Sequence, residues 1–333
     1  MSVFAPSMII LWKTIESCGV DPEPLFAAED IRPKLPIDPS MRMPYEKIDR
    51  IRAKAVKLCG DEAIGIRSAS VYSASQLGAL GYAWQVSMSL RNAFTRLERF
   101  IRVVNDKAVV LVENLDDIMV VTIRLDVPSE NLSARDDSAL AIITRMCTLV
   151  YGDSFRLQGV NFKHPAPRDF KPYFEFFACQ LNFDQADNQL LIPLSIADDL
   201  LVGANPELAL LNDQVVTRRL ALLDRNDIVA RVQSALMEQL PNGQVSDDSV
   251  AFALHMSVRT MHRKLADANQ NFRTLLVEMR RNLAEMYILD KSLTLTEISL
   301  LLGFSEPSSF SRAFKSWTGS APSEIRQARS DDA

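Results

Sequence analysis

Two stretches in the last hundred residues carry basic and hydroxyl side chains at the spacing of one helix face. In the first, Arg259, His262 and Arg263 fall at i, i+3 and i+4, and such positions are neighbours on a helix surface. In the second, Arg312 follows a pair of serines by three and four residues. Neither run, 257–265 or 308–315, contains an acid. Side chains of these types on an exposed helix present the hydrogen-bonding groups that contact DNA bases and phosphates.

The first stretch contains candidates for both kinds of contact. Arginine pairs with guanine, and histidine can donate or accept a hydrogen bond, so the candidates for base contacts are Arg259, His262 and Arg263. The candidates for phosphate contacts are Ser257, Thr260 and Lys264. His262 could instead be an ordinary exposed helix residue, and we interpret His255, just before the turn, as structural.

The second stretch has smaller side chains. Arg312 is the candidate reader of a base or of the backbone, and Lys315 is a candidate phosphate contact. Ser308 and Ser309 share the face of Arg312 and indicate backbone positioning more than sequence choice. In both stretches the alternative is a solvated helix face with no ligand.

The elements that must hold these residues are two helix-turn-helix patterns. In the second pattern, about 294–317, Thr294 or Thr296 can cap a helix, and Gly303 follows its apolar face where a left-handed residue ends a helix. Pro307 can open the next helix, whose inward residues are Phe310, Phe314 and Trp317. The first pattern, about 247–267, has an apolar face at Val250, Ala251 and Leu254 and a cap at Ser257. The repetition favours two DNA-reading units over one chance hairpin.

A long amphipathic helix over 272–289 is expected between the two patterns, and a turn at 241–243 before the first. At 1.5 Å per residue the helix would be roughly 27 Å long. Successive major grooves on one face of DNA lie about 34 Å apart, so such a spacer could hold two reading helices for neighbouring grooves.

At these residues the chain resembles the DNA-binding domain of the AraC/XylS family of transcriptional regulators. The resembling strings are MSVRTMHRKLADANQNFRTLLVEMRRNLAEMYI and LTEISLLLGFSEPSSFSRAFKSWTGSAPSEIR, which make up most of the last eighty residues. The resemblance places base contacts at the helix positions named above. It also implies double-stranded promoter DNA and RNA polymerase as partners, and activation more often than repression.

Composition is that of a soluble protein with a sizeable core and more than one domain. The 333 residues are 47% hydrophobic and 24% charged, with a net charge of -5. Residues 224–333 contain 13 Lys and Arg against 14 Asp and Glu, so the positive charge that attracts DNA must be local.

Four separated cysteines and three histidines show no metal-ligand spacing. The cysteines are therefore expected to be buried free thiols in a reducing compartment. No segment is long enough to span a bilayer and no signal peptide is evident, so we expect a cytoplasmic protein without a membrane partner.

The first 210 residues mix helices and strands. Helices are expected over 8–18, 45–58, 90–101, 139–151 and 206–223, and the basic residues of 45–58 indicate a solvated face. An antiparallel hairpin is expected over 107–112 and 118–125, a strand over 154–162 and two short strands around 184–188. Tyr82, Trp84, Phe100 and Arg102 have the residue types of a ligand pocket, but core packing explains aromatics at this spacing more simply.

Two strings of this half are QLGALGYAWQVSMSLRNAFTRLERFIRVV and HPAPRDFKPYFEFFACQLNFDQADNQLLIPLSIADDLLVGANPEL. In these strings the chain resembles the effector-binding domain of one AraC subgroup, the arabinose-binding-like type, rather than the cupin barrel of the arabinose regulator itself. The predicted fold is therefore an α+β sensor and dimerisation domain over 1–210, a linker over 211–226, and an all-α DNA-binding domain over 227–329 with two helix-turn-helix motifs joined by a long helix. The resemblance implies a small-molecule effector and a homodimer. No cofactor motif or catalytic set is visible, so the chain is not expected to be an enzyme. The alternatives are an effector-independent dimeric regulator, and a metabolite-binding protein or enzyme with a vestigial helix-turn-helix domain.

Overall fold

The computed structural model describes residues 1–32, 37–38, 40–125, 127–129, 132–223, 228–240, 245–288 and 293–328. Contacts divide the chain into two compact units, Met1–Asn212 and Asp213–Ala333. A helix, α10 (Pro206–Leu223), runs through the division and through most of the predicted linker. Residues 224–226 of that linker and the predicted turn at 241–243 lie outside the described residues.

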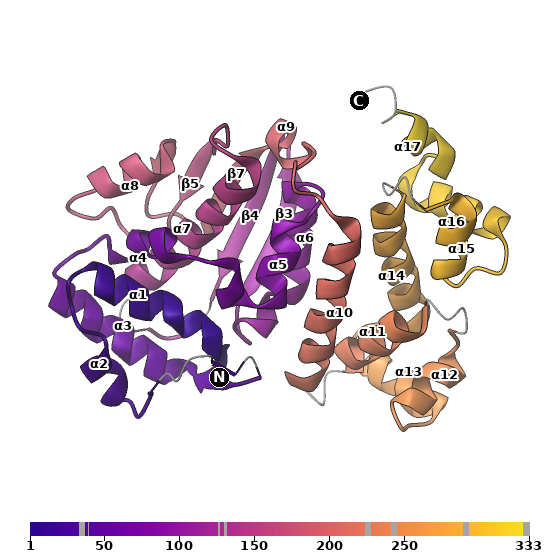
Figure 1. Ribbon diagram of the computed structural model, residues 1–333, viewed down its shortest axis with the longest axis horizontal. Coiled ribbons are helices and arrows are strands. Elements are labelled where there is room, and N and C mark those ends of the chain that lie inside the picture. The colour runs from indigo at the N-terminus through magenta and orange to yellow at the C-terminus, as the bar shows by residue number, and fades with distance from the viewer. Residues whose placement is uncertain are drawn as a thin grey trace. The chain divides into compact units, whose positions relative to one another are not determined.

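The N-terminal unit contains one main sheet of five strands (Figure 1). Its spatial order is β3-β4-β7-β5-β6, and all neighbours are antiparallel except β5 and β6. The strands are β3 (Val109–Leu115), β4 (Ile118–Arg124), β5 (Gly159–Asn161), β6 (Gln180–Asn182) and β7 (Asn188–Pro193). A separate two-stranded sheet pairs β1 (Ser2–Phe4) with β2 (Arg42–Pro44).

Helices pack against this sheet and against one another. They are α1 (Met8–Ser17), α2 (Glu23–Ala27), α3 (Tyr45–Cys59), α4 (Ile64–Arg67), α5 (Ala79–Gln85), α6 (Leu90–Phe100), α7 (Leu132–Tyr151), α8 (Lys171–Phe177) and α9 (Leu194–Ala197). The helices predicted over 8–18, 45–58 and 90–101 are confirmed within one residue. The α+β class is confirmed as well, because α6 packs on β3 and α7 packs on β7 and α4.

Three predicted boundaries in this unit are wrong. The hairpin turn is shorter than expected, because β3 continues to Leu115, which pairs with Ile118 and leaves only Asp116 and Asp117 between the strands. Asp116 adopts the left-handed conformation (φ +52°) that this tight turn needs. The strand expected over 154–162 is reduced to Gly159–Asn161, the three residues that pair with both β6 and β7.

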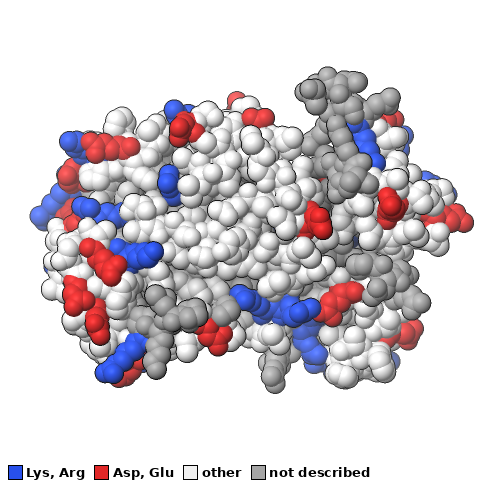
Figure 2. Space-filling view, viewed as in Figure 1, with Lys and Arg blue, Asp and Glu red and all other residues white. Residues whose placement is uncertain are grey.

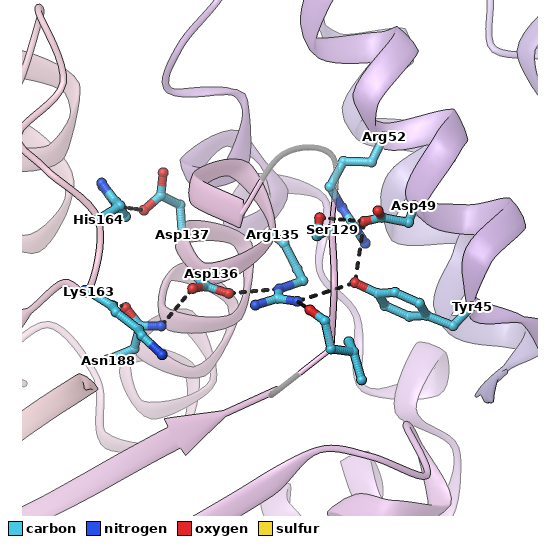
Figure 3. A network of polar contacts seen from close by, with 11 residues as sticks. Tyr45, Asp49, Arg52, Ser129, Arg135, Asp136, Asp137, Lys163, His164 and Asn188 are labelled. Carbon is cyan, nitrogen blue, oxygen red and sulfur yellow. Dashed lines mark hydrogen bonds and ion pairs between the residues drawn. The ribbon is translucent and has the colours of Figure 1, made fainter. Parts of the chain in front are cut away.

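The third error is the start of α7, which begins at Leu132 rather than at residue 139. Its first turns contain Arg135, Asp136 and Asp137, which resemble a surface segment in the sequence but are 9%, 8% and 0% exposed. They are buried as pairs: Arg135 Nε lies 2.8 Å from Asp136 Oδ1, and His164 Nε2 lies 2.7 Å from Asp137 Oδ1 (Figure 3). Buried charges are tolerated where they are paired, which is why this helix start could not be recognised from hydrophobicity.

Two residues of the basic face of α3 pair with the same carboxylate. Arg50 Nη2 lies 2.7 Å from Glu29 Oε2 and Lys54 Nζ lies 3.1 Å from Glu29 Oε1. The predicted solvated face is therefore also an ion-pair cluster, since Arg50 and Lys54 are exposed while Glu29 is buried. The hydrogen bond from Arg50, assisted by Lys54, lowers the pKa of Glu29 to about 2 although burial opposes this.

Because of Glu29, the stability of the N-terminal unit should depend on pH in the acidic range. Its pKa is depressed on folding, so its contribution is complete above the unfolded value of about 4.5 and is lost as the pH falls through about 2. We expect Glu29→Gln to lower the melting temperature at pH 6 and to have a smaller effect near pH 2.5. Thermal unfolding of the unsubstituted protein and of Glu29→Gln at both pH values measures the difference in melting temperature. A Glu29→Gln penalty that stays constant down to pH 2 would contradict the assignment.

The described part of the C-terminal unit is helical. After α10 follow α11 (Ile228–Gln239), α12 (Asp247–Ala253), α13 (Val258–Asp267), α14 (Phe272–Tyr287), α15 (Leu295–Leu301), α16 (Pro307–Thr318) and α17 (Pro322–Ala328). The two predicted helix-turn-helix pairs are thus α12–α13 and α15–α16, joined by α14 (Figure 1). At 16 residues, α14 is roughly 24 Å long.

Two further expectations concern thiols and membranes. All four cysteines are free, but only Cys147 is buried, whereas Cys18, Cys59 and Cys179 are half-buried, so the expectation of buried thiols is wrong for three of them. Burial, together with the neighbouring Cys18, raises the pKa of Cys59 to about 12.

Among the described residues, no helix combines the length and hydropathy that crossing a membrane requires.

Candidate nucleic-acid interface

The first helix-turn-helix pair is fixed by serine caps at both of its helix starts. The Ser246 hydroxyl accepts from the backbone N–H of Ser249 at 3.1 Å, and the Ser249 hydroxyl lies 3.0 Å from the Ser246 N–H, a reciprocal capping box at the start of α12. The Ser257 hydroxyl accepts from the Thr260 N–H at 3.2 Å and starts α13. Between them His255 has φ +55°. The structural role predicted for His255 is thus a left-handed residue that ends α12.

Helix α13 turns an apolar face inward and its candidate side chains outward. Met261 and Leu265 are fully buried in a cluster with Val250 and Leu254 of the preceding helix. Among the predicted contacts of this helix, Thr260 is half-buried and the others are exposed, namely Ser257, Arg259, His262, Arg263 and Lys264. The structure therefore brings these six residues to the surface of one short helix and its cap.

One acid reaches this face from outside the helix. His262 Nε2 lies 2.5 Å from Asp247 Oδ2, at the first residue of α12. Residues 257–265 contain no acid, and the sequence analysis missed this partner fifteen residues away. His262 can contact a base through Nε2 only if it separates from Asp247, so it is a weaker candidate than Arg259 or Arg263.

The second pair repeats this construction with different caps. Thr294 accepts from the Glu297 N–H at 3.1 Å while the Glu297 carboxylate accepts from the Thr294 N–H at 2.7 Å, which identifies Thr294 rather than Thr296 as the cap. Gly303 has φ +68° and ends α15, as predicted. Phe310 and Phe314 are fully buried, and the Phe304 ring lies between Phe310 and Trp317 at centroid distances of 5.9 and 6.2 Å.

The outward face of α16 carries Ser308, Arg312 and Lys315 exposed and Ser309 half-buried. Two of these hydroxyls already have neighbours, since Ser308 Oγ donates to Glu306 at 3.2 Å and Ser309 Oγ accepts from Arg312 at 3.4 Å. Glu306, the residue before the helix, places an acid beside Ser308. This face is less basic than that of α13.

Two arginines on the supporting helices hold the turns in place, and the sequence analysis did not identify either role. Arg231 of α11 donates to the Leu254 carbonyl at 3.1 Å, at the end of α12. Arg280 of α14 donates to the Leu302 and Gly303 carbonyls, both at 2.9 Å, at the end of α15. Cations at helix C-termini satisfy free carbonyls and the negative end of the helix dipole. Each turn is therefore held by an arginine from a helix outside the helix-turn-helix pair.

The charge pattern fits local rather than general attraction to DNA. On the face drawn in Figure 2, Lys and Arg lie interspersed with Asp and Glu, and large areas carry neither. This agrees with the net charge of -5. Within the described ranges, no group of three or more His, Cys, Asp or Glu residues is arranged to hold a metal ion.

Comparison with known proteins identifies both halves. A family model described as the N-terminal arabinose-binding domain of AraC transcription regulators matches residues 19–200, and a helix-turn-helix domain model matches residues 250–328. The ornithine utilization regulator of Pseudomonas aeruginosa is 29% identical over 314 residues, which is 93% of this chain and 92% of that protein. The transcriptional activator NphR of a Rhodococcus species is 30% identical over 133 residues, 40% of this chain and 38% of the relative.

Among solved structures, the transcriptional regulator CdpR from Pseudomonas aeruginosa aligns over 96% of this chain and 98% of its own, with a TM-score of 0.49 and 21% identity. The relatives named above are transcriptional regulators rather than enzymes. The arabinose-binding-domain model spans more than half of the sequence, and the helix-turn-helix model spans the two motifs built above. The chain therefore belongs to the AraC family of transcription regulators and is a DNA-binding helix-turn-helix protein.

Proposed function

We propose that this regulator binds two neighbouring major-groove segments of promoter DNA with α13 and α16, and that a small molecule in the N-terminal unit modulates this binding. The observation that carries the proposal is the repeated construction of the two motifs. In each, an apolar inward face and an arginine clamp fix a helix whose outward face is polar and cationic. Helix α14, roughly 24 Å long, links the motifs within one unit.

Within this proposal α13 selects sequence and α16 mainly positions the protein. Arg259 and Arg263 contact base edges, with His262 as a third reader once it leaves Asp247. Ser257, Thr260, Lys264 and Lys315 contact phosphates. Arg312 reads a base or the backbone, and Ser308 and Ser309 support it.

We propose residues 1–210 as the effector-binding domain and residues 227–329 as the DNA-binding domain. Activation through RNA polymerase is the proposed output, and the relative NphR, a transcriptional activator, supports activation.

Arg263→Ala should lower the affinity for the selected operator relative to random DNA by about 1–3 kcal/mol, because one base contact is lost while the phosphate contacts remain. Competition gel shifts with specific and random duplexes measure this ratio. Arg273→Ala is the matched control, since Arg273 is an exposed arginine on α14 and not on a reading helix. Equal losses on both duplexes for Arg263→Ala would exclude it as a base reader.

The proposal includes a homodimer, and α10 offers a surface for a second copy. Leu208, Leu211, Val215 and Leu222 are 42–67% exposed and follow the 3–4–7 spacing that pairs helices in coiled coils. We expect Leu211→Glu to weaken dimerisation by roughly ten- to hundredfold, since a buried leucine contributes strongly to such a seam. Sedimentation of the full chain measures this, with the equally exposed Leu149→Glu on α7 as control. Identical dimer constants for the two variants would rule out α10 as the interface.

A further inference from the structure

The N-terminal unit contains a cavity of about 230 Å³ between the β3–β4 hairpin and helices α1, α3 and α7. Most of its wall is apolar, with Met8, Leu11, Ile48, Ile142 and Met146 among the lining residues. Protein interiors normally have few voids larger than a water molecule. An apolar cavity of about 150 Å³ is already large enough to bind benzene. This space is therefore large enough for an organic ligand.

The charged part of the wall is of one sign. Among the described residues that line the cavity, those with a charge are Arg52, Arg124 and Arg135. Each is oriented by one carboxylate that is not part of the lining: Asp49 at 2.9 Å, Asp187 at 2.7 Å and Asp136 at 2.8 Å, respectively. The guanidinium groups are thus held in fixed positions, as a preformed site requires.

Arg135 is the best placed of the three. Figure 3 shows it between Asp136, which accepts from Nε, and the Tyr45 hydroxyl, which accepts from Nη1 at 3.4 Å. Nη1 also donates to the Val127 carbonyl at 3.0 Å. The two N–H groups of Nη2 have no partner among the described residues. Because Arg135 is only 9% exposed, an acceptor that reached Nη2 would form a charge-assisted hydrogen bond largely shielded from water.

A second, more polar cavity of about 670 Å³ adjoins the first. The two share Ile123, Arg124, Leu125 and Arg135 in their walls. The second is lined in addition by Lys163, His164 and Asn188, and by Asp136 and Asp187, the carboxylates that pair with Arg135 and Arg124. Arg124 and Arg135 therefore stand where an apolar space meets a polar one. A ligand that fits both spaces has an apolar body and a polar head, and the arginines at the junction select a negative head.

We propose that this cavity binds a small organic acid, with one carboxylate on an apolar body of about six to ten carbon atoms, a size scaled from the benzene-sized cavity. The body occupies the space between the hairpin and α7, and the carboxylate accepts hydrogen bonds from Arg135. Arginine suits this role because its planar donors match a carboxylate. An ammonium head is disfavoured in the first cavity, because the charged residues in its described lining are three arginines. The inference rests on the proposed effector function, for which it names the site and the ligand class.

Calorimetric titration of the full chain tests the ligand class with defined probes. Octanoate and 3-phenylpropanoate represent alkyl and aryl acids, and octanamide and octylammonium are the neutral and cationic controls. We expect at least one acid to bind and to raise the melting temperature of the protein, and both controls to bind at least roughly tenfold more weakly. Binding of octanamide or octylammonium as tight as that of the acids would overturn the assignment of the head group. Binding of none of the four would overturn the proposal.

Two variants locate the site. Arg135→Gln should weaken acid binding by roughly ten- to hundredfold, because a hydrogen bond to a charged donor is lost. Arg156→Gln, which removes an exposed arginine of the same unit that donates to the Asp153 carbonyl, should leave binding unchanged. If Arg135→Gln does not fold, Ala139→Leu carries the test, because Ala139 lines the cavity and the larger side chain fills part of it while every residue of the ion pairs is kept. Unchanged acid binding in a folded Arg135→Gln or Ala139→Leu protein would place the ligand elsewhere.

The proposed regulation is measured separately, by the effect of the bound acid on operator affinity in a gel shift. Acid binding that leaves operator affinity unchanged would support the cavity and contradict effector control. Operator affinity that responds to a cell extract, while none of the probes binds, would support effector control and overturn the ligand class.

Discussion

Asp137→Ala is expected to destabilise the N-terminal unit by about 3–5 kcal/mol, the usual result of removing one partner from a buried charged pair. The Asp137 carboxyl is fully buried and accepts from Tyr173 Oη at 2.5 Å, while His164 Nε2 lies 2.7 Å away. His164 Nδ1 lies 2.8 Å from the Pro165 carbonyl, so Nδ1 must carry a proton. The 2.7 Å contact between Nε2 and the carboxyl then needs one further proton on one of its two atoms. Burial raises the pKa of Asp137. Alanine would leave the histidine and the tyrosine without their partner.

Urea unfolding followed by the fluorescence of the buried Trp84 measures the effect in the N-terminal unit. Asp153→Ala is the control, since Asp153 is exposed and a surface change of this kind should stay within about 0.5 kcal/mol. Asp137→Asn keeps the shape and an acceptor oxygen, so we expect about 1–3 kcal/mol for it. If Asp137→Ala cost no more than Asp153→Ala, the pair would not contribute to stability as described.

Arg280→Met is expected to destabilise the second helix-turn-helix pair by about 3 kcal/mol, because two carbonyls at the end of α15 lose a charged donor. Arg280 donates to the Leu302 and Gly303 oxygens at 2.9 Å, and its guanidinium carbon lies 4.5 Å from the centre of the Phe304 ring. Methionine preserves much of the apolar stem, so the loss of stability reports the contribution of the guanidinium group. DNA affinity should fall as well, because α16 packs on the turn that Arg280 holds.

Hydrogen–deuterium exchange of the α15 and α16 amides measures the loss of protection in this motif. The matched control is Arg281→Met, one residue along α14, where an exposed arginine pairs with Glu285 at 2.8 Å. Exposed pairs at this spacing contribute about 0.3–0.5 kcal/mol, so exchange should change little. Equal exchange in the two variants would show that Arg280 does not hold the turn.

The helix-turn-helix motifs could be predicted because their signals are local. The Thr294 cap, the left-handed Gly303 and the inward Phe310 and Phe314 lie within 21 consecutive residues, and each is recognisable by residue type. The contacts that complete the motifs are not local in this sense. The Arg280 clamp spans 22 and 23 residues and the His262–Asp247 pair spans 15, so no short pattern reveals them.

The N-terminal unit was less predictable because its charged residues are buried. Arg135, Asp136 and Asp137 made the start of α7 resemble a surface segment, and only their partners on distant elements explain their burial. The cavity is assembled from several helices and two strands. Its lining does not include Tyr82, Trp84, Phe100 or Arg102, the aromatic and basic candidates seen in the sequence, and Trp84 and Phe100 are core residues. Core packing, the simpler interpretation, is correct for these two aromatics.

The central claim is that α13 and α16 read two neighbouring grooves from one chain. Selection of binding sites from random duplexes by the full-length protein, followed by methylation-protection footprinting of the selected site, tests it most directly. We expect two protected major-groove segments on one face, about 10 base pairs apart for each bound chain, with stronger sequence conservation in the segment contacted by α13. A single protected segment for each chain, or no enrichment with or without cell extract, would contradict it.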